Sequence, residues 1–166
     1  TIGKTYLARP DNIEKYTEGR FSPKGLATHA AALEGKPHPA RGSVPVSGQI
    51  DPNLRTGLLV TEEDLSPGWI LDQVQPVASA MLQTTSGRSP LAVSNNVLDF
   101  VGSAMTDCKN RFADRLEHVI PCTPQDIVSW AKDNDITQIV TSYPPIGPTA
   151  NALQDIHFVQ LIRPFD

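Results

Sequence analysis

Short runs of apolar residues recur along the second half of the chain, and polar or turn-forming residues bound each of them. The apolar positions are consecutive and do not alternate with polar ones. Runs of this kind, about four to eight residues long, are typical of strands that are buried on both faces. The pattern predicts strands at residues 57–61, 90–94, 117–121, 137–142 and 157–162.

Helical patterns fill the intervals between these runs. A helix is predicted over 66–81, with a kink or a break at Pro76, because proline removes a backbone donor and clashes with the preceding turn. A long helix follows over 97–112. Thr123 begins another helix, since a cap residue is followed by proline at the first helical position. A short helix is predicted over 148–156.

Strands and helices therefore alternate, and the strands are apolar throughout. This combination indicates a mostly parallel sheet that helices cover on both faces. With right-handed crossovers, the prediction is an open five-stranded sheet in a Rossmann- or flavodoxin-like three-layer α/β sandwich.

The first 56 residues have a different character. Ser22 and Pro23 predict a short helix over 22–34, and a region rich in proline and glycine follows without periodicity. We expect three segments: a tail at 1–35, a linker at 36–56 and an α/β domain at 57–166. The chain opens at Thr1 inside apparently ordered sequence, so we expect a piece of a longer protein.

Composition and charge narrow the classes of function. The chain has 166 residues and a formal net charge of −4, with no run of Lys or Arg. By itself it is therefore not expected to bind nucleic acid. No stretch approaches the roughly 20 apolar residues of a membrane helix. Cys108 and Cys122 are predicted to be buried free thiols in a cytoplasmic protein, and the histidines lack metal-ligand spacing, so no metal is expected.

Polar residues follow several of the predicted strands, at the edge of the sheet where such folds bind ligands. The candidates are Thr61, Glu62, Asp64, Ser94, Ser142 and Tyr143. The carboxylates of "TEEDL" fit either a general acid/base pair or the acidic first turn of a helix, and the second interpretation is preferred. Glycine-rich phosphate loops and the G-x-S-x-G nucleophile motif are absent from the sequence, so no catalytic residue is predicted.

Four stretches together resemble the α/β domain of the photolyase and cryptochrome family: "GLLVTEEDL", "FVGSAMTDCKNRFADRLEHVIP", "TPQDIVSWAKDNDITQIVTSYPP" and "HFVQLIRPFD". The segment "GKTYLARPDNIEKYTEGRF" resembles the end of the flavin-binding helical domain in some bacterial photolyase-related proteins, with Tyr6, Asn12 and Tyr16 at matching positions. The order is reversed relative to a typical photolyase, in which the α/β domain comes first.

The resemblance implies a parent protein that is an FAD-dependent blue-light DNA repair enzyme, a deoxyribodipyrimidine photolyase, or a photoreceptor. The fragment alone would not be catalytic. It would hold an antenna chromophore (a pterin, deazaflavin, flavin or lumazine) between the ends of the first and fourth strands, and would contact the flavin-binding helical domain of the same parent chain. DNA would be bound only through the parent. By the same resemblance, Tyr6 and Asn12 would lie near FAD.

Two alternatives stay open. One is a structural or interaction module with an empty cleft, and the other is a nucleotide-binding α/β protein unrelated to light. Trp69 and Trp130 both fall on predicted helices, where core packing explains them better than electron transfer.

Overall fold

The computed structural model describes residues 8–26, 29, 31–32, 34–35, 42–43 and 45–164. They belong to two compact units, 1–43 and 44–166. In the first unit, α1 (Pro10–Tyr16) begins with proline in its first turn and buries no residue. The described residues of the predicted helix 22–34 are not helical, so this prediction is wrong there. Gly25 has a φ of 76°, which a right-handed helix cannot contain.

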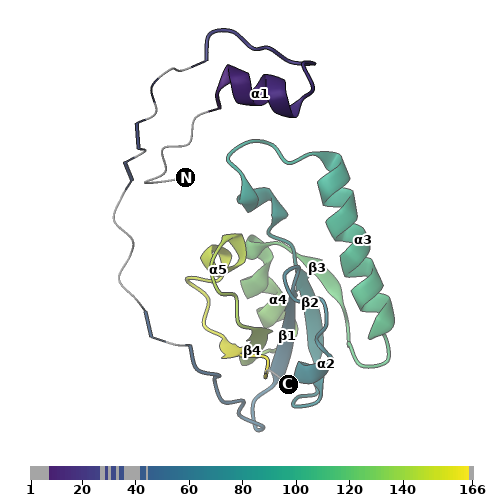
Figure 1. Ribbon diagram of the computed structural model, residues 1–166. Helices are drawn as coiled ribbons and strands as arrows, with labels where there is room; N and C mark the ends of the chain where they lie inside the picture. The colour runs from purple at the N-terminus through teal and green to yellow at the C-terminus, as the bar shows by residue number, and fades with distance from the viewer. Residues whose placement is uncertain are drawn as a thin grey trace. The chain divides into compact units, whose positions relative to one another are not determined.

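The second unit contains a five-stranded sheet in which every pair of neighbouring strands is parallel (Figure 1). The spatial order is β3-β2-β1-β4-β5. The strands are β1 (Thr56–Thr61), β2 (Ala78–Leu82), β3 (Ile120–Cys122), β4 (Gln138–Ser142) and β5 (Val159–Leu161). The predicted open parallel sheet is confirmed, and β1 lies at its centre, between β2 and β4.

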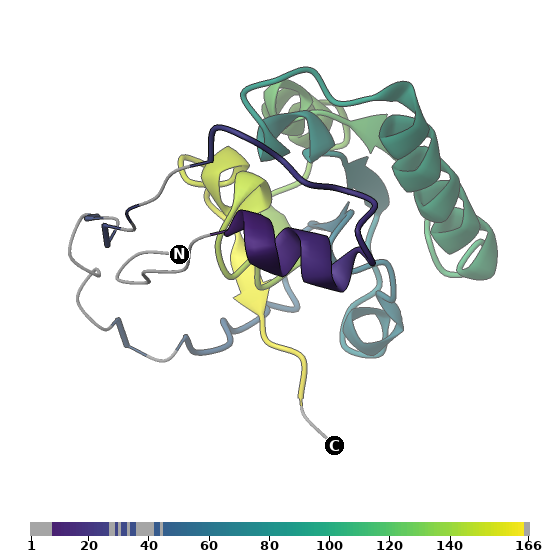
Figure 2. The same cartoon turned by 45° about the horizontal axis from the view of Figure 1, so that its top comes forward.

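Helices pack on both faces of this sheet. They are α2 (Gly68–Leu71), α3 (Asn95–Arg111), α4 (Ile127–Asp133) and α5 (Pro148–Ala152), with 3₁₀ turns η1 (Thr85–Arg88) and η2 (Pro124–Asp126). Alternate residues of β1 point to opposite faces, as a strand requires. Leu58 packs on the side of α2 and α3, where Met105 and Cys108 are buried. Leu59 packs on the side of α4, where Trp130 is buried. Figures 1 and 2 show α3 standing beside the β3 edge.

The second predicted strand was wrong. Residues 90–94 form no strand and are mostly exposed, whereas β2 lies in the interval that was predicted to continue the helix 66–81. The helix ends at Leu71, ahead of Pro76. Both faces of β2 are buried, which its small and apolar residues allow. The predicted third strand is shifted: β3 begins at Ile120, after His118 adopts a φ of 44°.

Other elements match their predictions. α3 covers most of 97–112, and both cysteines are buried and free. Before α4, Thr123 and Asp126 form a capping box, in which the Thr123 amide donates to Oδ2 of Asp126 at 2.9 Å. Hydrogen bonds from the side chain and backbone of Thr123 lower the pKa of the Asp126 carboxyl. Among the described helices, none combines the length and apolarity that crossing a membrane requires.

The stretch 45–55, within the predicted linker, is bonded to the end of the sheet. The amide of Gly48 donates to the carbonyl of Gln160 at 2.7 Å, and the amide of Ile162 donates to Oγ of Ser47 at 2.8 Å. A Cβ at Gly48 would lie 2.8 Å from Cγ1 of Val159, so glycine allows this close approach. The stretch therefore covers the outer edge of β5 and protects it from pairing with another strand.

Candidate functional site

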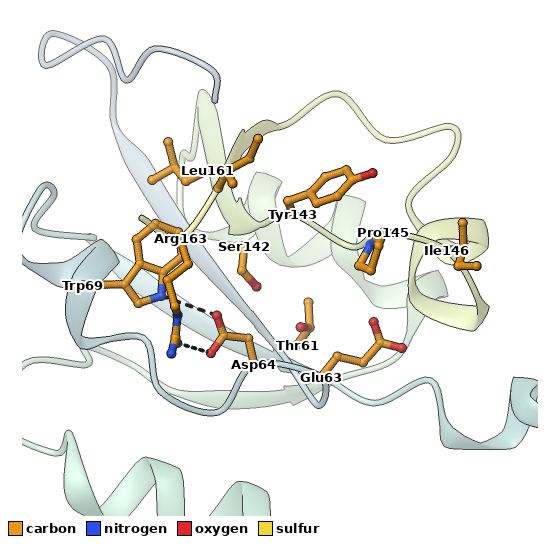
Figure 3. A pocket seen from close by; sticks show the side chains of 11 residues that line it. Thr61, Glu63, Asp64, Trp69, Ser142, Tyr143, Pro145, Ile146, Leu161 and Arg163 are labelled. Carbon is orange, nitrogen blue, oxygen red and sulfur yellow. Dashed lines mark hydrogen bonds and ion pairs between the residues drawn. The ribbon is translucent and has the colours of Figure 1, made fainter. Parts of the chain in front are cut away.

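A pocket of about 570 Å³ opens beyond the carboxyl ends of β1, β4 and β5 (Figure 3). Strand order reverses between β1 and β4, since the chain proceeds outward to β3 on one side of β1 and to β5 on the other. Open α/β sheets bind ligands at such a switch point. The fold therefore places the pocket where a ligand is expected.

The polar part of the pocket begins with two hydroxyls at the ends of neighbouring strands. Thr61 ends β1 and Ser142 ends β4, and both are buried residues that line the pocket. Neither hydroxyl bonds to another residue of the described ranges. By contrast, Thr141 donates to the carbonyl of Leu59 at 2.8 Å. The Thr61 and Ser142 hydroxyls can therefore serve a ligand without breaking a bond within the described chain.

One side of the pocket is formed by an indole, a carboxylate and a guanidinium (Figure 3). Arg163 forms an ion pair with Asp64 and also donates to the carbonyl of Ser66 at 3.0 Å. Its guanidinium carbon lies 5.7 Å from the centre of the Trp69 ring, within cation–π range. Nε1 of Trp69 points to Oδ2 of Asp64 at 3.4 Å. Asp64 thus orients both neighbours.

The remaining wall is apolar. Leu161 is buried at the end of β5, and Ile162 follows it. On the other side, the turn after β4 contributes Tyr143, Pro145 and Ile146, of which Ile146 is 85% exposed. The amide of Tyr143 donates to the carbonyl of Leu161, which fixes the start of this turn. An aromatic ring could pack among these side chains with its polar edge toward the strand ends.

The structure does not bring Glu62 into the pocket. Its side chain is 1% exposed, and its carboxylate accepts hydrogen bonds from the amides of Thr84 and Thr85, both at 3.1 Å. It also accepts from Oγ1 of Thr85 at 2.5 Å and from Nη2 of Arg88 at 2.9 Å. These hydrogen bonds to Glu62 hold η1 next to the end of β1.

The remaining candidates are Ser94, Asn12 and Tyr6. Ser94 is exposed and directly precedes α3, and it does not line the pocket. Asn12 is exposed on α1, in the first unit. Tyr6 lies outside the described residues. The pocket thus combines Thr61, Asp64, Ser142 and Tyr143 from the sequence-based set; it also includes Glu63, Trp69 and Arg163, which that set omitted.

Both tryptophans were attributed to core packing. Trp130 is 2% exposed, and Trp69 is partly buried and packs against the core cluster of Leu58 and Met105, but Trp69 also lines the pocket. The signal for Arg163 is its place two residues after β5, the strand that neighbours β4. A parallel neighbour brings its carboxyl end to the same edge of the sheet, so residues following the last strand belong to the candidate set.

Thiol chemistry is disfavoured. Burial raises the pKa of the Cys122 thiol to about 11 and also raises that of Cys108, so both are protonated at neutral pH. Within the described ranges, no group of three or more His, Cys, Asp and Glu side chains is arranged to hold a metal ion.

The chain matches no model of a known protein family and no curated protein sequence. Fold and pocket define an α/β domain with a doubly wound parallel sheet and a cleft at its switch point. The functional proposal therefore depends on the pocket itself.

Proposed function

We propose that this chain is the ligand-binding α/β domain of a flavoprotein related to photolyases and cryptochromes, and that its pocket holds an aromatic chromophore. The observation that carries the proposal is the pocket beside Trp69, which pairs an indole with the hydroxyls of Thr61 and Ser142. The resemblance in sequence supports the choice of family.

The size and chemistry of the pocket support a ligand with a fused ring system. Its volume of about 570 Å³ falls within the roughly 300–1,000 Å³ typical of small-molecule sites. Trp69 and Leu161 offer apolar surface for the rings, and aromatic packing adds about 0.5–1.5 kcal/mol beyond burial. The strand-end hydroxyls can donate to or accept from ring nitrogens and carbonyls.

In this proposal the domain binds and positions the chromophore, which would pass excitation energy to FAD in the parent protein. The flavin-binding helical domain of the parent would be the partner, and DNA would be bound only through the parent protein. A cytoplasmic location forms part of the proposal, because two free buried thiols fit a reducing compartment.

Equilibrium titration tests the proposal. The full chain is titrated with riboflavin, a lumazine and a pterin, and the fluorescence of ligand and tryptophan is followed. We expect saturable binding of at least one ligand, weakened at least tenfold by Tyr143→Ala. Tyr16→Ala is the matched control, since Tyr16 is 78% exposed on α1 and does not line the pocket. Tyr16→Ala should leave the Kd unchanged.

A spectrum of the purified chain, and of the solution after heat denaturation, complements the titration. A released chromophore with a near-UV or blue band would support the proposal and identify the ligand. A protein-only spectrum combined with no saturable binding would overturn it, and would favour a module that acts through its surfaces.

A further inference from the structure

We infer that the pocket selects a ligand without a phosphate group, and that Glu63 at its exposed side disfavours anionic tails. This inference rests on the proposed function, because it concerns the ligand of the same pocket. It names the ligand class as a neutral fused-ring compound that carries hydroxyl groups.

Three charged side chains line the pocket: Glu63, Asp64 and Arg163. The charge of Arg163 is balanced by Asp64, with which it forms an ion pair, and the same guanidinium donates to the carbonyl of Ser66. Glu63 is exposed and has no ion-pair partner in the described part of the chain. The lining therefore has a net charge of about −1, which repels a phosphate.

Several backbone amides near the pocket already donate to carbonyls of the protein. Phosphate sites in α/β folds use amides of the turns that follow the strands. Here the amide of Glu62 donates to the carbonyl of Leu82, and the amide of Asp64 donates to the carbonyl of Thr61. After β4, the amide of Tyr143 donates to Leu161.

The two residues that follow Tyr143 are prolines, which have no amide proton. The next helix, α5, also begins with a proline, Pro148. Pro144, Pro145 and Pro148 therefore remove three amide donors from the turn after β4 and the first position of α5.

The other polar groups of the pocket suit a neutral ligand. The hydroxyls of Thr61 and Ser142 each donate one hydrogen bond and accept others. The exposed carboxylate of Glu63 accepts hydrogen bonds only, so it can bind the hydroxyl groups of a sugar-alcohol tail but not an anionic group. Riboflavin has this chemistry. FMN is the same molecule with a phosphate at the end of the tail, so the two form a matched pair.

The test is a titration of the full chain with riboflavin and with FMN at low ionic strength. We expect riboflavin to bind at least tenfold more tightly, and added salt to narrow the ratio because it screens the repulsion. Glu63→Lys should bring the two affinities to within about threefold. Asp133→Lys is the matched control, because it makes the same charge change at an exposed site at the end of α4, before β4 begins. The ratio should persist in that variant.

The outcomes separate the two claims. If FMN binds as tightly as riboflavin, and Tyr143→Ala weakens both, the pocket is a ligand site and the charge selection is overturned. If the Glu63→Lys and Asp133→Lys variants narrow the ratio equally, total charge and not Glu63 is responsible, which also overturns it. If neither flavin binds, and neither do the lumazine and the pterin, the proposed function fails and the inference fails with it.

Discussion

Arg163 forms an ion pair with Asp64, 99 positions earlier in the chain, and so joins the segment after β5 to the turn after β1. The same guanidinium lies over Trp69. Two strand ends that are not neighbours in the sheet are thereby linked across the pocket. The pocket wall is complete only when β1, β4 and β5 have assembled.

Replacing Arg163 by glutamine should affect binding more than stability. The side chains of Arg163 and Asp64 are 50% and 21% exposed, so the pair contributes at most about 1 kcal/mol to the free energy of unfolding. The variant leaves Asp64 uncompensated and makes the pocket more negative. In titrations we expect the preference for riboflavin over FMN to increase. The free energy of unfolding, measured by urea denaturation, should change little. A stability loss above about 2 kcal/mol would instead indicate a structural role for the pair.

Glu62 and Glu63 are adjacent but should differ sharply in their effect on stability. Glu62→Gln replaces a buried carboxylate oxygen with an amide NH₂ that faces the donors of Thr84, Thr85 and Arg88. We expect it to lower the free energy of unfolding by about 2–4 kcal/mol. Glu63→Gln, on an exposed side chain, should change it by less than about 0.5 kcal/mol. Urea denaturation of the two variants checks the contrast, and equal losses would refute the anchoring of η1.

Two glycines should respond in opposite directions to alanine. A Cβ at Gly57 would lie 2.5 Å from Cδ1 of Ile136 and 2.8 Å from Cη2 of Trp130, so overpacking should cost about 1–3 kcal/mol. A Cβ at Gly102, within α3, meets no described atom within 4 Å. Gly102→Ala should therefore stabilise by about 0.5–1 kcal/mol through helix propensity. Thermal unfolding measures both, and a neutral Gly57→Ala would contradict the close packing.

The thiols should be unreactive in the folded chain. The pKa of Cys122 is raised from 9.0 to about 11 by burial, so its thiolate is scarce at pH 8. We expect an aromatic disulfide reagent to modify neither cysteine until urea unfolds the chain, and then both. Because the folded pKa lies above the unfolded one, the corresponding stability is present below pH 9 and is lost as the pH rises through about 11. Rapid modification at neutral pH would contradict this burial.

The sequence predicted the sheet because its central strands are buried on both faces. In β1 and β4 every residue is buried, and the apolar runs of the sequence reflect this directly. β2 was missed because Val74, Val77 and Met81 happen to follow helical spacing. Tertiary burial overrides such local periodicity. The exposed stretch 90–94 resembled a strand only because it is apolar.

A pocket lies at the strand ends where the sequence predicted a ligand site, and its lining includes only part of the predicted set of residues. Glu62 and Asp64 are two positions apart, yet their side chains have different partners. Glu62 accepts from the amide of Thr84, whereas Asp64 pairs with Arg163. Trp69 lies on α2 and is only partly buried, so it also lines the pocket. Arg163 reaches the site only because β5 lies beside β4. These are tertiary relationships, and local patterns do not encode them.

The most direct test of the central claim uses the two tryptophans of the chain, which report on different places. Trp69 lines the pocket, whereas Trp130 is buried against the opposite face of the sheet. In ¹H–¹⁵N spectra of the full chain titrated with riboflavin, we expect the indole resonance of Trp69 to shift saturably and that of Trp130 to stay in place. A Trp69 resonance that does not move at saturating riboflavin, or a shift confined to Trp130, would contradict a flavin-type ligand in this pocket.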